Sequence, residues 1–145
     1  ETPAARDALS YGAYVSGIAL ANAGLGAVHG LAGVVGGETC EPHGAICGRL
    51  LPQILCTLGE VAPEGSPTSA RLALIDTALK TALGVGRDGL ADWIAQRGLV
   101  PDRPPLDAAT RHRIAAQSAA SSSMKASPIL LSDMQLATAL ERAGW

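Results

Sequence analysis

The sequence has no phenylalanine, and aromatic residues make up only 3% of its 145 residues. Its hydrophobic share of 48% must therefore come mainly from Ala, Leu, Val and Ile. Ala is the strongest helix former, and small side chains let helices pack closely. Few segments alternate between apolar and polar residues with a period of two, which argues against strands. We predict an all-α fold of about six to seven helices, in a chain long enough for one domain with its own core.

The sequence also lacks an excess of positive charge, because its formal net charge is −2 and its basic residues are scattered. This distribution excludes the electrostatic footprint of a nucleic-acid binder. No apolar run reaches the ~18–20 residues that span a bilayer, and no signal peptide is apparent, so we expect no membrane segment. The sequence begins with Glu1 rather than Met, so we expect either a processed start or a piece of a longer chain.

Cysteine is scarce, and Cys40, Cys47 and Cys56 form an odd set. Their spacing matches neither a disulfide framework nor a zinc ribbon. We therefore expect a reducing compartment, the cytoplasm. Cys40 and Cys47 flank His43, so a Cys-His metal site is conceivable, but the spacing fits no zinc pattern, and Cys47 is more simply a small buried side chain.

Proline and capping residues predict where helices begin. Thr2 followed by Pro3 predicts a first helix over residues 3–23, because a hydroxyl caps the first turn and Pro fits its first position. One face of this helix carries Gly, Ala and Ser, and we expect it to pack in the interior. Further helices are predicted over residues 28–35, 42–58, 67–83, 87–97 and 108–122, and from residue 133 onward. We find no internal repeat and no second domain.

The glycine-rich stretch of residues 24–52 contains His29 and His43, two of the three histidines. Neutral imidazole is a common ligand of divalent metals, but two histidines alone do not complete a site. From the residues alone, His43 beside Pro42 could equally cap a helix, and the glycines near His29 could serve packing. The third histidine, His112, lies among charged residues and is expected to be solvated.

Three motifs carry a resemblance to a known family. The first two are GIALANAGLGAVHGLAG, which contains His29, and PHGAICGRLLP, which contains His43. The third is the C-terminal segment MKASPILLSDMQLATALERA. Together they resemble the C-terminal helical domain of the iron-containing alcohol dehydrogenases, and the resemblance extends over essentially the whole chain.

The resemblance implies a two-domain enzyme in which an N-terminal α/β domain binds NAD or NADP. Residues 1–145 would then be the helical metal-binding domain, without the nucleotide-binding domain. In the family, one Asp and three His hold iron or sometimes zinc, and the last two histidines match His29 and His43. The Asp and the first His lie upstream of Glu1. The metal would act as a Lewis acid on an alcohol or carbonyl oxygen during hydride transfer.

From this resemblance we expect a chain that is inactive as a dehydrogenase by itself and binds metal weakly at best. No catalytic residue other than the metal ligands is assigned to it. Its expected partners are the nucleotide-binding domain, a small alcohol or carbonyl substrate, and a second copy of the chain. We expect self-association because an isolated helical domain would expose the apolar surface that its partner domain covers.

One departure from the family concerns Gly33, because many members carry a further His at this position near the nicotinamide. A proton-relay role therefore cannot be assigned here, and water or a cofactor hydroxyl would have to replace it. A maleylacetate reductase-like enzyme is an alternative, although Val28 and Gly44 favour the alcohol dehydrogenases. A second alternative is a non-catalytic helical interaction module, which Gly33 mildly favours.

Overall fold

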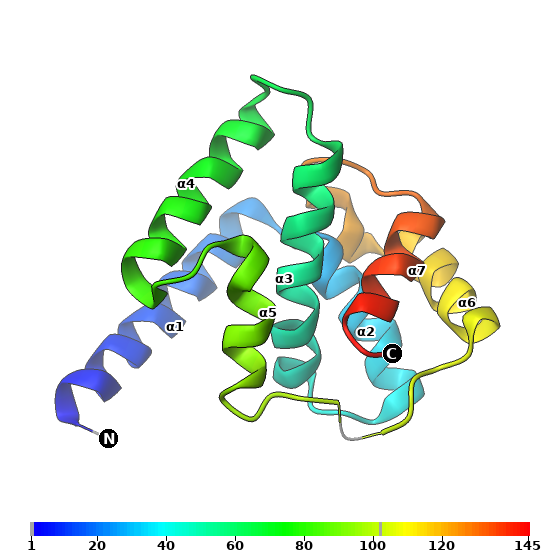
Figure 1. The fold of residues 1–145 in the computed structure, drawn as a ribbon, viewed down its shortest axis with the longest axis horizontal. Coiled ribbons are helices and arrows are strands. Elements are labelled where there is room, and N and C mark those ends of the chain that lie inside the picture. Colours follow the sequence, from blue (N-terminus) through cyan, green and yellow to red (C-terminus); the bar gives the residue numbers. More distant parts are fainter. Residues whose placement is uncertain (1, 102) are drawn as a thin grey trace.

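The computed structural model describes residues 2–101 and 103–145, and these residues form a helical assembly without a strand (Figure 1). The all-α prediction is confirmed, with 74% of the described residues in helices. The elements of the described part are α1 (Pro3–Ala23), α2 (Ala27–Thr39), α3 (His43–Val61), α4 (Pro67–Leu83), α5 (Arg87–Ala95), α6 (Ala108–Ala119), a short 3-10 helix η1 (Ser122–Ala126) and α7 (Asp133–Arg142).

Side-chain caps set the helix starts that the sequence predicts. The hydroxyls of Thr2 and Ser66 accept hydrogen bonds from backbone N–H groups in the first turns of α1 and α4. Asp107 caps α6 in the same way, and Ser132 forms a capping box with Gln135 at the start of α7. Each cap satisfies a backbone donor that the helix itself leaves unpaired.

Two helix ends differ from the sequence prediction. α2 continues to Thr39 and takes in the glycine pair expected to end it. It stops at Cys40, which adopts a left-handed conformation with a φ of 58°. α6 ends at Ala119, and the polar serine run forms the 3-10 helix η1 instead of a last α-helical turn.

The core lies among α2, α3, α6 and α7, with α3 at the centre of the molecule (Figure 1). Aliphatic side chains from these helices are almost fully buried, as is the indole of the C-terminal residue. The largest of them are Leu31, Val35, Ile46, Leu50, Ile114, Leu136, Leu140 and Trp145. Trp145 therefore supplies much of the aromatic area in a core that contains no Phe.

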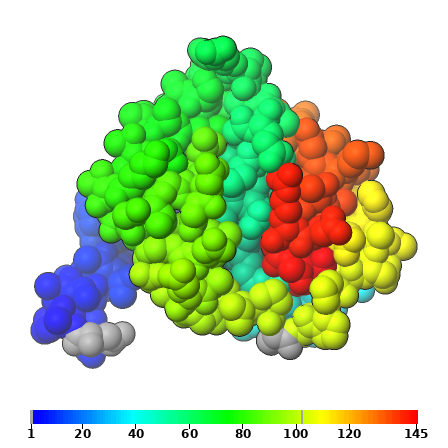
Figure 2. Space-filling model, in the orientation of Figure 1, coloured from blue at the N-terminus to red at the C-terminus, as the bar shows by residue number. Residues whose placement is uncertain are grey.

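The helix α1 projects from the body, as the space-filling view shows (Figure 2). None of its residues is buried, so the prediction that its small-residue face packs in the interior is wrong. α1 carries exposed Leu, Ile and Tyr side chains, and Tyr11 is 71% exposed. The small residues permit close packing, but every residue of α1 is exposed.

No single helix in the described ranges is long and apolar enough to cross a membrane. α1 and α2 reach that length and hydropathy only as a pair, and they are bent by 103° at the break between them.

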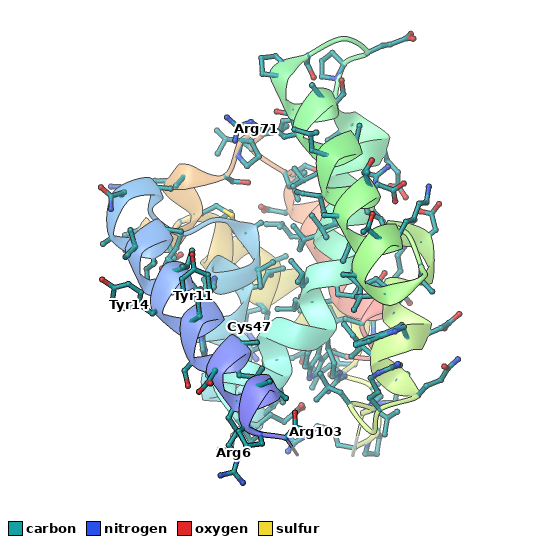
Figure 3. All side chains as sticks on the ribbon, turned by 90° about the vertical axis from the view of Figure 1, so that its left-hand side faces the viewer. Arg6, Tyr11, Tyr14, Cys47, Arg71 and Arg103 are labelled. Atoms are coloured by element: carbon teal, nitrogen blue, oxygen red, sulfur yellow. The ribbon has the colours of Figure 1, made fainter. Side chains whose placement is uncertain are left out.

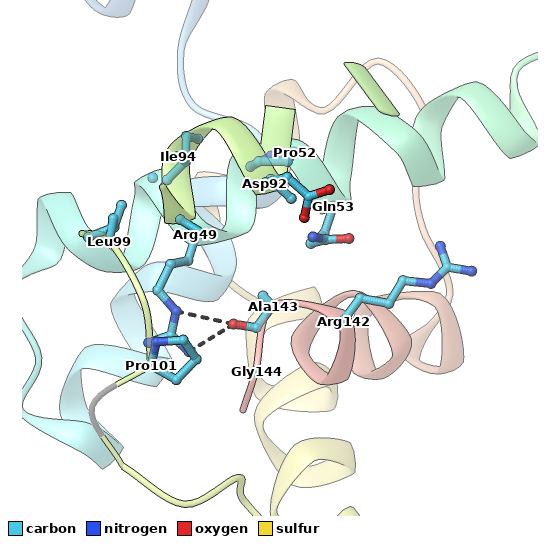
Figure 4. Close-up of a pocket in the computed structure, with 13 residues that line it drawn as sticks. Arg49, Pro52, Gln53, Asp92, Ile94, Leu99, Pro101, Arg142, Ala143 and Gly144 are labelled. Carbon is cyan, nitrogen blue, oxygen red and sulfur yellow. Dashed lines mark hydrogen bonds between the residues drawn. The ribbon is translucent and has the colours of Figure 1, made fainter. Parts of the chain in front are cut away.

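A buried polar network ties the C-terminus to the start of α3. Arg49 donates from Nε and Nη2 to the carbonyl oxygen of Ala143, at 3.1 and 2.8 Å (Figure 4). Its Nη1 lies 2.7 Å from the Glu41 carboxylate, and both side chains are over 90% buried. The indole N–H of Trp145 donates to the same carboxylate at 2.9 Å, and the Arg49 guanidinium stacks on the indole ring. These contacts fix the turn that precedes His43.

Candidate metal centre

His29 lies in the first turn of α2, where the chain has turned sharply after α1. The break between the two helices is glycine-rich, and Gly24 adopts a φ of 73° that favours glycine. At Gly30, a Cβ atom would lie 2.8 Å from the methyl carbon of Met124, so glycine lets η1 pack closely on α2. Packing of this kind holds the start of α2, and with it His29, against the body.

His43 is the first residue of α3, directly after the turn of residues 40–42. Pro42 precedes it with a φ of −58°, and Glu41 is held by the Arg49 network. Cys47 follows one helical turn later, so its side chain lies on the same face of α3 as His43. Figure 3 shows Cys47 between α1 and α4, in a view onto the side from which α1 projects.

The structure brings the two predicted histidines together. Their ring centroids are 5.5 Å apart, and the ring planes are tilted by 46°. The Sγ atom of Cys47 lies 3.4 Å from Nε2 of His43. One donor atom from each of the three residues falls within 4.8 Å of the other two. The cluster spans two helices that the sequence separates by a glycine-rich stretch.

The electrostatics of the cluster favour neutral imidazole at His29. Partial burial lowers the pKa of His29, and the neighbouring His43 lowers it further. Burial raises the pKa of the Cys47 thiol. A metal ligand must be free of its proton, so His29 is ready to coordinate at neutral pH, whereas Cys47 would release a proton on binding.

An apolar hollow opens beside the cluster and has a volume of about 400 Å³. His29 and Cys47 contribute to its wall, together with Val28, Leu51 and Leu55. A concave, mostly apolar site with a few polar groups at one end is the usual form of a small-molecule site.

The remaining candidates lie elsewhere. Glu41 is engaged by Arg49 and Trp145, and Glu38 pairs with Arg113 at 3.0 Å, so neither carboxylate completes the cluster. His112 is exposed, as expected. Asp76 of α4 accepts a hydrogen bond from the backbone N–H of Arg87 at the start of α5.

Sequence reasoning considered a Cys-His metal site but set Cys47 aside as a member of the cluster. It treated the residue as a buried apolar side chain, but the thiol is only partly buried and contacts His43. The signal was present in the spacing, because residues four apart on one helix share a face. Gly33 lies one turn after His29, exposed, with open space where a Cβ atom would be.

The donor set fits a divalent metal of borderline softness. Two imidazoles and one thiolate suit zinc, cobalt or iron better than the oxygen-preferring magnesium and calcium. The cluster supplies three donors, which is the number that catalytic zinc sites draw from protein.

Comparison with known families gives an independent result. Residues 1–88, which include α1 to α4 and all three members of the cluster, match the family described as Fe-containing alcohol dehydrogenase family, C-terminal. No curated protein and no solved structure matches the chain. The matched residues make up more than half of the sequence and contain His29 and His43 within the resembling motifs. The chain belongs to the Fe-containing alcohol dehydrogenase family and corresponds to its C-terminal, all-helical part.

Proposed function

We propose that this protein is the helical half of a metal-dependent, NAD(P)-linked alcohol dehydrogenase. The observation that carries the proposal is the convergence of His29 and His43, whose ring centroids lie 5.5 Å apart within a family match that covers both. In this proposal the two histidines are metal ligands, and the reaction is oxidation of an alcohol or reduction of an aldehyde or ketone.

The chain's own residues would hold the metal and shelter the reacting group. His29 and His43 would coordinate iron or zinc through neutral imidazole nitrogens. The bound ion would supply Lewis acidity toward the substrate oxygen. The apolar hollow beside His29 would exclude water from the alkyl part of a small substrate, which strengthens nearby electrostatic interactions. Since Gly33 carries no side chain, water or a cofactor hydroxyl would accept the proton of the substrate's hydroxyl group.

Hydride transfer would also require the nucleotide-binding half, which would supply NAD(P), and the resemblance places the remaining Asp and His ligands upstream of Glu1. We propose that this half, in the same or a separate chain, covers the exposed face of α1. The support is that α1 presents Tyr11, Tyr14 and Ile18 to solvent, and apolar patches of this kind mark interaction surfaces. Without that half, the same face would favour self-association. The three free cysteines suit a reducing compartment such as the cytoplasm.

Metal binding by histidine variants tests the ligand assignment. We expect His29→Ala and His43→Ala each to lower the metal content of the purified protein, measured by plasma mass spectrometry after loading with zinc or iron. His112→Ala is the matched control, since His112 is exposed and far along the chain from the cluster. Unchanged metal content in both cluster variants would show that the ligand assignment is wrong.

Two alternatives make different predictions for activity. A maleylacetate reductase-like enzyme, assembled with its nucleotide-binding half, would reduce an unsaturated keto acid in preference to simple aldehydes. The residues Val28 and Gly44 favour the alcohol dehydrogenase instead. A non-catalytic module would bind its partner but give no NAD(P)-linked turnover with either substrate, and the absence of a side chain at Gly33 favours this alternative mildly. Assays of the assembled halves with both substrate classes separate the three.

A further inference from the structure

We propose that Cys47 is a third metal ligand, so that this chain alone contains a His2Cys site selective for zinc or cobalt over iron. The inference deepens the proposed function and rests on it, because it takes His29 and His43 as ligands. It puts a thiolate from α3 in the place of the Asp and the first His that the resemblance places upstream of Glu1, and it replaces the expectation of weak metal affinity with one of a complete three-ligand site.

The distance between the α3 donors supports coordination of one ion. Zinc takes nitrogen ligands at about 2.0–2.1 Å and thiolate at about 2.3 Å in tetrahedral geometry, which places the two donor atoms about 3.6 Å apart. The observed separation of Cys47 Sγ and His43 Nε2 is 3.4 Å. An ion could therefore bind both atoms with little movement of either side chain.

The third donor comes from the facing helix. His29 offers a ring nitrogen within 4.8 Å of both other donors. A tetrahedral site requires nitrogen donors to lie somewhat closer than this limit, so a modest rotation of the imidazole would complete the set. His29 is half-buried and His43 exposed, which leaves access to a fourth ligand such as water or substrate.

The other cysteines show what is distinctive about Cys47. Cys56 lies on the same helix and is also half-buried, but its sulfur lies 3.8 Å from the carbonyl oxygen of Arg87 and from a carboxylate oxygen of Asp88. Cys40 is exposed in the turn between α2 and α3. Neither belongs to the three-donor cluster. Only Cys47, among the three, combines partial burial with two nearby imidazoles.

A thiolate ligand would change which metal the site prefers. Soft sulfur donors select zinc and related metals, whereas oxygen donors suit harder ions. A donor set of two imidazoles and a thiolate therefore shifts preference from Fe²⁺ toward Zn²⁺, relative to a set of imidazoles and a carboxylate. The electrophile in this protein would be zinc, and the role of the metal as a Lewis acid would be unchanged.

Cobalt spectroscopy tests the proposal without an activity assay. The metal-free, reduced protein is titrated with Co²⁺ under anaerobic conditions, and the near-ultraviolet thiolate-to-cobalt charge-transfer band is recorded. We expect the band in the parent protein and in Cys56→Ser, the matched control, and its loss in Cys47→Ser. Zinc affinity, measured by competition with a chromophoric chelator, should fall at least about tenfold in Cys47→Ser. Even the loss of a group that only hydrogen-bonds to a ligand lowers metal affinity by about 10–100-fold, and here a ligand itself is removed.

A second variant and a folding measurement keep the result interpretable. Cys47→Ala removes the oxygen that Ser could offer, and far-ultraviolet circular dichroism verifies that both variants remain helical. If Cys47→Ser and Cys47→Ala keep the charge-transfer band and zinc affinity while His29→Ala loses metal, the thiolate ligand is refuted and the histidine site stands. If the histidine variants also keep full metal binding, both this inference and the proposed metal centre are overturned.

Discussion

The buried ion pair between Arg49 and Glu41 offers the sharpest test of how this fold is held together. We consider Glu41→Gln, which keeps the shape of the side chain but removes its charge. Arg49 would then keep its guanidinium in a site where its side chain is only 4% exposed. Removing one partner of a buried pair costs about 3–5 kcal/mol, because it leaves an uncompensated charge away from water. Given typical domain stabilities of about 5–15 kcal/mol, that loss is large.

Urea unfolding followed by circular dichroism measures this loss of stability. We expect a lower urea concentration at the unfolding midpoint and an unchanged dependence of the unfolding free energy on urea concentration. The matched control is Glu60→Gln, which breaks the pair of Glu60 with Arg142 at 2.8 Å, where the side chains are 54% and 44% exposed. An exposed pair contributes about 0–1 kcal/mol. If Glu41→Gln lowers the free energy of unfolding no more than Glu60→Gln does, the Arg49–Glu41 network does not stabilise the fold as argued.

A double substitution separates the ion pair from its surroundings. Glu41→Gln combined with Arg49→Met removes both charges while the Gln side-chain carbonyl can still accept from the Trp145 indole N–H, and replacing a buried pair by uncharged residues is often neutral. The Ala143 carbonyl, which accepts two hydrogen bonds from Arg49, would then lose its donors at a cost of about 1–3 kcal/mol. We therefore expect the double variant to be more stable than Glu41→Gln. A double variant less stable than the single one would contradict the assignment of the loss to the unpaired charge.

Two further predictions concern helix ends. Ser132→Ala removes the capping box that Ser132 forms with Gln135, and we expect a loss of about 1 kcal/mol in urea unfolding; no loss would mean that the cap is dispensable. Hydrogen bonds from the Lys80 side chain and from the backbone N–H of Arg87 hold the pKa of Asp76 below its ordinary value of 3.8. This stabilisation is present above pH 3.8 and is lost as the pH falls through the folded-state pKa, because the unfolded state then binds more protons. Asp76→Asn should therefore lower stability at neutral pH and flatten its fall below about pH 4, in urea unfolding at several pH values; an unchanged pH profile would refute the linkage.

Local sequence signals determined the helices themselves. Thr2-Pro3, Ser66-Pro67 and Ser132 mark helix starts because a side-chain oxygen and a backbone donor lie only three residues apart. The same kind of short-range information correctly indicated that His112 is solvated. The motifs around His29 and His43 indicated the family, which the comparison then confirmed over residues 1–88.

Contacts between residues distant in the sequence were decided only by the tertiary structure. The small-residue face of α1 permits close packing, but whether a partner helix meets it depends on the direction in which the chain leaves Gly24, and α1 is exposed. Glu41 and Trp145 are 104 residues apart, so no local pattern predicts their hydrogen bond. In the same way, the stretch 24–52 supplied two histidines as candidates, while only the approach of α2 to α3 brought them within reach of each other and of Cys47. Propensity and capping act over a few residues and can be inferred from the chain, whereas a site built from two helices depends on how those helices cross.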